Sequence, residues 1–96
     1  MKGTGGQVTE ETGDLIGTVR TCLRILYALE EEGVPARQRR IAERTGRHPA
    51  AVSQTMARMK STGLLDIGPG RRILLTERGR REATIAIRKY RLAERL

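Results

Sequence analysis

Apolar side chains recur every three to four positions through most of this 96-residue chain, as they do along the buried face of an α-helix. Gly33, Gly46 and Gly63 interrupt this pattern, and glycine is common directly after a helix. Pro49 can open a helix because its missing N–H group costs nothing in the first turn. The pattern therefore predicts four helices, over residues 15–33, 36–45, 49–62 and 77–96.

The spacing of apolar side chains changes between the third and fourth predicted helices. Residues 64–67 and 72–75 are short apolar runs on either side of a Gly-Pro-Gly-Arg turn, which indicates a β-hairpin. The second and third helices are joined only by residues 46–48, so they must cross sharply, as in a helix-turn-helix. We predict a mainly α, winged helix-turn-helix fold with a three-helix core, a hairpin wing and a long C-terminal helix.

Composition limits the possible domain organisation, location and classes of function. Residues 1–13 are rich in Gly and Thr without apolar periodicity, so we expect a flexible N-terminal arm before a single domain over residues 14–96. No apolar run resembles a signal peptide or a membrane span, which favours a cytoplasmic, nucleoid-associated protein and no membrane partner. One Cys and one His exclude a disulfide framework and a self-contained Cys/His zinc site. Without a phosphate-binding glycine loop or a nucleophile paired with a base, we do not expect an enzyme.

The third predicted helix has an outer face of unusual composition. Val52, Met56 and Met59 form its apolar stripe, and the remaining positions carry no acid. Small side chains, a hydroxyl, an amide and one guanidinium suit close approach to base edges and phosphates, although an ordinary solvated helix could also look like this. These outward positions are Ala50, Ala51, Ser53, Gln54 and Arg58.

The charge distribution favours nucleic acid as the partner. The formal net charge is +8, but residues 1–33 hold three bases against six acids, so the positive charge belongs to the later elements. Residues 30–32 place three acids at a helix C-terminus, where the helix dipole disfavours them, so basic neighbours are expected in the fold. Clustered arginines follow in the second helix, in the link and at the hairpin tip, where a solvated surface is the alternative to phosphate contact. The candidates include Arg39, Arg47, Arg71 and Arg72, with His48 beside the third helix.

The last predicted helix carries more apolar surface than one small core needs. Ala83 and Ile87 share one face, whereas Ile85, Leu92 and Leu96 extend another. Exposed apolar surface of this kind usually marks an interface. We therefore expect a homodimer, which would match a palindromic operator in double-stranded DNA.

Several sequence blocks together resemble the N-terminal DNA-binding domain of the diphtheria toxin repressor and related iron-dependent regulators. The most specific are VSQTMARM at 52–59 and RKYRLAERL at 88–96, and the similarity runs without evident gaps from about residue 15 to the end. The resemblance implies a bacterial transcription factor whose third helix lies in the major groove. The family's base and phosphate contacts carry over to Gln38, His48, Ala50, Ala51, Ser53 and Gln54, of which only Ser53 and Gln54 keep the family's residue types.

The resemblance fails at the family's metal ligands. Thr21 stands where the family has a Met, Tyr90 stands where it has a His, and only Glu94 keeps a ligand type. Further ligands would lie after Leu96, so the chain is either a relative under another control or a piece of a metal-dependent repressor. We therefore expect no metal site in these residues and no cofactor.

We interpret the chain as a sequence-specific, double-stranded DNA-binding transcription regulator, for which a repressor is the favoured role and an activator stays open. The alternative is a winged helix that binds another protein. The concentration of basic charge argues against that alternative, because protein-binding surfaces are depleted of charge at their centres.

Overall fold

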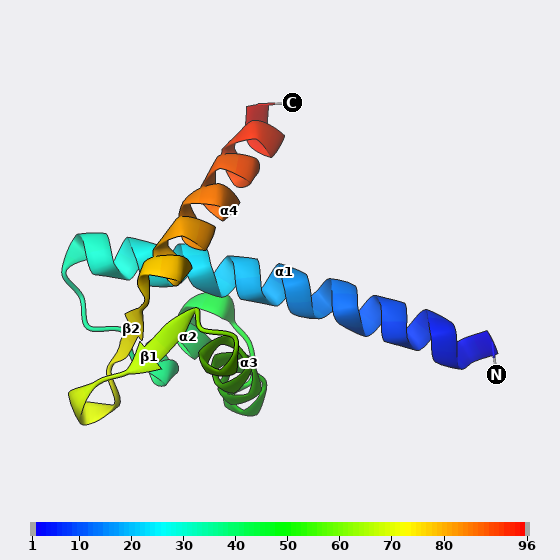
Figure 1. Cartoon of the computed structure of the whole chain (residues 1–96), viewed down its shortest axis with the longest axis horizontal. Coiled ribbons are helices and arrows are strands. Elements are labelled where there is room, and N and C mark those ends of the chain that lie inside the picture. The colour runs from blue at the N-terminus through cyan, green and yellow to red at the C-terminus, as the bar shows by residue number, and fades with distance from the viewer. Residues whose placement is uncertain (1, 96) are drawn as a thin grey trace.

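The winged helix-turn-helix is confirmed in a computed structural model, which describes the backbone of residues 2–95 and the side chains of residues 17–89. Four helices and a two-stranded antiparallel hairpin follow one another in the predicted order (Figure 1). The elements are α1 (Lys2–Glu32), α2 (Gln38–Thr45), α3 (Pro49–Ser61), β1 (Leu65–Ile67), a 3₁₀ turn (Pro69–Arg71), β2 (Ile73–Leu75) and α4 (Glu77–Arg95).

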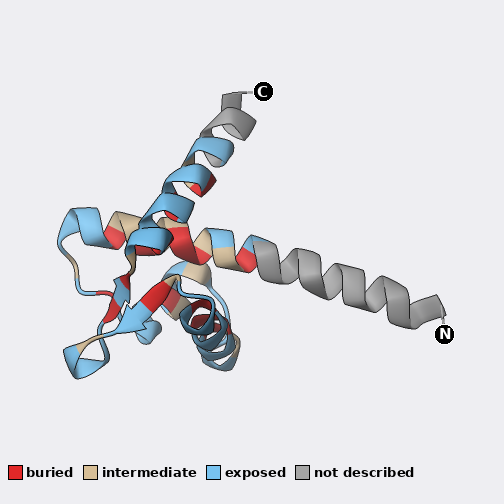
Figure 2. Ribbon diagram, in the orientation of Figure 1, coloured by how far each residue is buried: buried red, intermediate tan, exposed pale blue. Residues whose placement is uncertain are grey.

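The elements are arranged around α1. Helices α2 and α3 and the hairpin lie on one side of α1, whereas α4 crosses α1 and leaves on the other side (Figure 1). Buried side chains gather where these elements meet (Figure 2). Helix α3 and the hairpin therefore lie opposite most of α4 (Figure 1), although residues 62–64 and β2 contact its first turn.

The core is aliphatic and sulfur-containing, as the absence of Phe and Trp requires. The predicted stripe of α3 is confirmed, with Val52, Met56 and Met59 at most 4% exposed. Helix α4 contributes the small side chains Ala83 and Ala86, while its larger Ile85 remains 45% exposed. Other buried members are Cys22, Leu23, Leu26, Leu29, Ala36, Ile41, Leu65, Ile73 and Leu75. Leu92 and Leu96, which were expected to extend the apolar surface of α4, have side chains outside the described residues.

Two helix starts differ from the sequence prediction. Helix α1 begins at Lys2, so its backbone includes most of the segment expected to be an arm, and the flexibility of that segment stays a prediction. Helix α2 begins at Gln38 instead of residue 36, because the carbonyl of Ala36 accepts a hydrogen bond from the Ile73 amide at 2.8 Å. This contact holds the chain before α2 extended against the hairpin.

Local chemistry explains most other boundaries. Gly33 and Gly63 have φ of 73° and 79°, and the amides that follow them bond back to Leu29 and Met59. This is the Schellman arrangement, in which a left-handed residue ends a helix, and glycine adopts it without strain. At the start of α4, the Thr76 hydroxyl accepts a hydrogen bond from the Gly79 amide at 3.0 Å and donates one to the Gly63 carbonyl at 2.7 Å. Thr76 thus caps α4 and ties it to the end of α3.

Candidate nucleic-acid interface

Helix α3 is divided into the two faces that its sequence predicts. Its apolar stripe packs into the core, while Ala50, Ser53, Gln54 and Arg58 are exposed and Ala51 is half-buried. No acid occurs anywhere in α3. The exposed face can therefore approach a polyanion without charge repulsion from its own helix.

His48 has a structural role that the sequence interpretation did not identify. Its Nδ1 accepts a hydrogen bond from the Ala50 amide at 3.1 Å, so the imidazole caps the N-terminus of α3. Capping satisfies one of the free amides at the helix start, and the other ring nitrogen remains available to an external acceptor. A polar residue directly before Pro49 was the signal for this cap.

The N-terminal end of α3 forms a shallow hollow with α2. Gln38, Arg39 and Arg47 line it together with Pro49, and its volume is about 530 Å³. Arg39 also lies 3.8 Å from Glu43, but its side chain is 93% exposed, so solvent weakens that ion pair. The tertiary structure therefore brings these three candidate residues to one site at the start of α3.

The hairpin tip presents the other two candidate arginines. The strands pair in register from Leu65 with Leu75 to Ile67 with Ile73, and the turn places Gly70 and Arg71 at φ of 67° and 63°. A positive φ is unusual for a residue with a Cβ, so the hairpin holds Arg71 in a strained backbone conformation.

Arg71 and Arg72 are both exposed. Nε of Arg37 donates to the Gly70 carbonyl at 3.4 Å, which links the tip to the start of α2. No feature of the sequence indicated this link. We call the exposed side of α3, its preceding link and the hairpin tip together the contact face.

Four arginines on the contact face differ from Arg44 and Arg80 in their ionic partners. Within the described side chains, no carboxylate lies within 4 Å of Arg47, Arg58, Arg71 or Arg72. These guanidinium groups are therefore available to external phosphates.

The acids at the end of α1 have the basic neighbours that the sequence predicts. Glu30 receives two hydrogen bonds from Arg80, at 2.7 and 3.1 Å, and Glu32 receives one from Arg44 at 3.3 Å. The bond to Glu30 raises the pKa of Arg80 above its usual value. We call these four residues the paired cluster. Arg44 is one of the clustered arginines of the second predicted helix, for which phosphate contact and a solvated surface were the alternatives, and the structure gives it this internal partner.

The described residues do not fit a metal centre. They contain no cluster of three or more His, Cys, Asp or Glu side chains placed to share an ion. Thr21 accepts a hydrogen bond from Nη2 of Arg24 at 3.4 Å, which puts a positive group beside the position of a family ligand. The side chains of Tyr90 and Glu94 lie outside the described residues.

Cys22 is a core residue, as expected for a lone thiol on an apolar stripe. It is 1% exposed, and burial raises the pKa of its thiol to about 11, with a smaller opposing effect from the charge of Arg47. A neutral buried thiol is a poor nucleophile.

No helix in the described part of the chain is both long and apolar enough to cross a membrane.

Comparison with known proteins decides between the classes that this geometry allows. The family described as iron dependent repressor, N-terminal DNA binding domain, matches residues 14–73. The chain belongs to the iron-dependent repressor family. Its matched residues correspond to the N-terminal DNA-binding domain of that family.

Named relatives support the assignment to this repressor family. The chain is 48% identical over 83 residues to a diphtheria toxin repressor of Corynebacterium jeikeium, and the match covers 86% of the chain and 35% of the relative. It is also 48% identical to the iron-dependent repressor IdeR of Mycobacterium tuberculosis, where the match covers 86% and 36%. The chain thus spans about a third of the length of these relatives.

Solved structures support the winged-helix fold of this family member. Lactococcus lactis ZitR superposes with a TM-score of 0.69 at 19% identity, covering 96% of this chain and 70% of that one. A Mycobacterium tuberculosis MarR family protein, Rv2887, solved in complex with DNA, superposes with a TM-score of 0.63 at 19% identity, covering 93% and 78%. At these identities the similarity concerns the fold alone.

Proposed function

We propose that this domain represses transcription by placing α3 in the major groove of a specific operator. The observation that carries the proposal is the acid-free exposed face of α3, flanked on both sides by arginines without carboxylate partners among the described side chains. The major groove admits an α-helix and presents a distinct donor and acceptor pattern for each base pair. A repressor then acts by occupying promoter DNA.

Within this proposal the contact residues fall into two groups. Ser53 and Gln54 reach base edges, because a hydroxyl and an amide can both donate and accept hydrogen bonds, while the methyl groups of Ala50 and Ala51 allow close approach. The basic and N-terminal polar groups hold the phosphates on either side. This second group comprises Gln38, Arg39, Arg47, His48, Arg58, Arg71 and Arg72.

We further propose a homodimer on a palindromic operator. The sequence expectation of apolar surface on the last helix, extended by Leu92 and Leu96, supports the dimer, and two-fold symmetric proteins bind two half-sites related by the same symmetry. Light scattering of the purified protein tests the dimer. Nucleoid association in the cell stays a prediction of the same proposal.

Selection from a random double-stranded DNA pool, followed by fluorescence anisotropy, tests the whole proposal. We expect an inverted repeat with half-sites about one helical turn apart, bound far more tightly than shuffled DNA, with affinity that falls steeply with salt. An unenriched pool and weak binding at both 50 and 200 mM salt would instead support the protein-interaction alternative, because phosphate contacts must respond to salt.

A further inference from the structure

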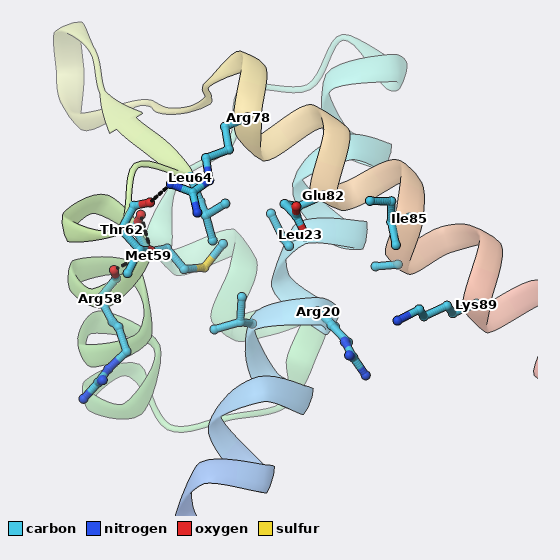
Figure 3. A pocket seen from close by; sticks show the side chains of 12 residues that line it. Arg20, Leu23, Arg58, Met59, Thr62, Leu64, Arg78, Glu82, Ile85 and Lys89 are labelled. Carbon is cyan, nitrogen blue, oxygen red and sulfur yellow. Dashed lines mark hydrogen bonds between the residues drawn. The ribbon is translucent and has the colours of Figure 1, made fainter.

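A groove of about 420 Å³ lies on the side of the domain away from the start of α3. It is bounded by α1, the C-terminal end of α3 and α4 (Figure 3). This volume falls within the range of pockets that hold drug-sized molecules. The proposed DNA contacts of Gln54 and of the hairpin tip lie outside it, whereas Arg58, a proposed phosphate contact, also lines it.

The floor of the groove is apolar. Leu23 of α1, Met59 of α3 and Ala86 of α4 are buried at its base, and Ile85 stands at its lip with 45% of its surface exposed. Figure 3 shows Leu23, Met59 and Ile85 approaching from three different helices. An apolar ligand body would be released from water here, which favours binding roughly in proportion to the area buried.

The rim of the groove is cationic. It carries Arg20, Arg58, Arg78 and Lys89 against a single acid, Glu82. Part of the Arg78 guanidinium is already hydrogen-bonded within the fold, because its Nη1 donates to the Thr62 carbonyl at 3.2 Å. Arg20 and Lys89 have no carboxylate within 4 Å among the described side chains, and Figure 3 shows their charged ends at the same end of the groove.

We propose that this groove binds a small organic anion with an apolar body, such as an aromatic carboxylate or sulfonate. The apolar part would lie on Leu23, Met59 and Ile85, and the anionic group would meet Arg20 and Lys89. The combination is specific to this ligand class, because a neutral apolar molecule would leave the cations unpaired and a hydrophilic anion would not use the floor. The charge complementarity also favours it over a second copy of this basic chain.

The test uses two fluorescent probes of similar shape. The first is 8-anilinonaphthalene-1-sulfonate, and the second is N-phenyl-1-naphthylamine, which lacks the sulfonate. We expect the double variant Arg20→Gln/Lys89→Gln to weaken sulfonate binding about tenfold while leaving the neutral probe within about twofold, because only the charged hydrogen bonds are lost. Ile85→Asn should weaken both probes, since both use the apolar floor.

The matched control is Arg40→Gln/Arg88→Gln, which removes the same charge from two exposed residues that do not line the groove. Equal weakening by this control would overturn the proposal, because it would show attraction to net charge alone. Failure of either probe to bind saturably would also overturn it. Loss of probe binding as the protein dimerises, followed by light scattering, would overturn the proposal as well. In that case a second copy of the chain would occupy the groove. Probe binding is measured without DNA, so this result is independent of the proposed operator recognition.

Discussion

The contact face and the paired cluster both contain arginines, but only the arginines of the paired cluster have carboxylate partners within the described part of the fold. In the paired cluster, Arg80 and Arg44 meet Glu30 and Glu32, which come from a different helix. On the contact face, Arg58, Arg71 and Arg72 have no such partner among the described side chains. A count of arginines therefore does not separate internal ion pairs from charges open to a partner, whereas the distribution of acids does.

The difference follows from where the acids lie in the sequence. Glu30 and Glu32 occur at the end of α1, close to α2 and α4, so the arginines nearest to them are neutralised within the fold. Helix α3 and the hairpin turn have no acids of their own. The arginines of the contact face therefore have no acid from α3 or from the hairpin turn to offset their charge.

The largest effect is expected at the joint between the contact face and α4. A Cβ on Gly79 would collide with the Leu64 carbonyl, which is backbone and cannot move aside easily. We expect Gly79→Ala to lower the free energy of unfolding by about 2 to 3 kcal/mol, as overpacking does in well-packed cores. Urea unfolding at fixed protein concentration measures this.

Gly17→Ala is the matched control for that substitution. Apart from its own helix backbone and its chain neighbours, no atom of the described residues lies within 4 Å of a Cβ placed on Gly17, which is an exposed position in α1. It should leave stability unchanged or raise it by up to about 1 kcal/mol, because Ala has the higher helix propensity. Similar losses in both variants would contradict the close contact at Gly79.

Sequence readout by the contact face should depend on Gln54. We expect Gln54→Ala to cost about 1–3 kcal/mol on the selected operator and to relax preference at one base pair, with little change on shuffled DNA. Anisotropy titrations on both DNAs measure the difference. Thr84→Ala, an exposed polar truncation on α4, should change neither affinity, and equal loss on both DNAs for Gln54→Ala would remove this residue from base readout.

The hairpin tip should contribute affinity without specificity. We choose Arg71→Asn/Arg72→Gln because Asn tolerates the positive φ of residue 71 and so preserves the turn. The salt dependence of DNA binding should become shallower by roughly one to two units, because that many phosphate contacts are lost. Arg81→Gln/Arg88→Gln removes equal charge from α4, and a slope that changes as much in this control would show that the tip is merely solvated.

The paired cluster should influence stability slightly and DNA binding not at all. Arg80→Gln should lower Tm by a small amount that disappears at about 1 M salt, because the side chains are partly exposed and salt screens such pairs. Glu30→Gln should act similarly, and the double variant should add little to either single one. If either variant changed operator affinity by more than about twofold, the paired cluster could not be regarded as separate from the contact face in DNA binding.

The smallest effect is expected from metal ions. Thr21 on α1 is bonded to Arg24, and the described residues lack a ligand cluster, so adding Fe²⁺, Mn²⁺ or Ni²⁺ after a chelator should change operator affinity less than about twofold. Anisotropy with and without each metal measures this. A tenfold gain would reveal a site completed by side chains outside those described.

The sequence by itself determined the elements and the character of α3. Apolar spacing, the glycines after α1 and α3, and Thr76 before α4 are local features, because the groups that form each helix end lie within a few residues of one another. The division of α3 into an apolar stripe and an acid-free face is equally local. The identities of Ser53 and Gln54 and the resemblance to iron-dependent repressors followed from the same segment.

Only the tertiary structure decided which charges remain free and where pockets form. Arg80 and Glu30 are 50 residues apart, and the Ile73 amide that delays the start of α2 comes from the hairpin. The groove likewise combines side chains of α1, α3 and α4. Periodicity places a side chain on one face of its own helix, but the partner of that face depends on how distant segments pack, because such contacts form only when the chain closes long loops between them.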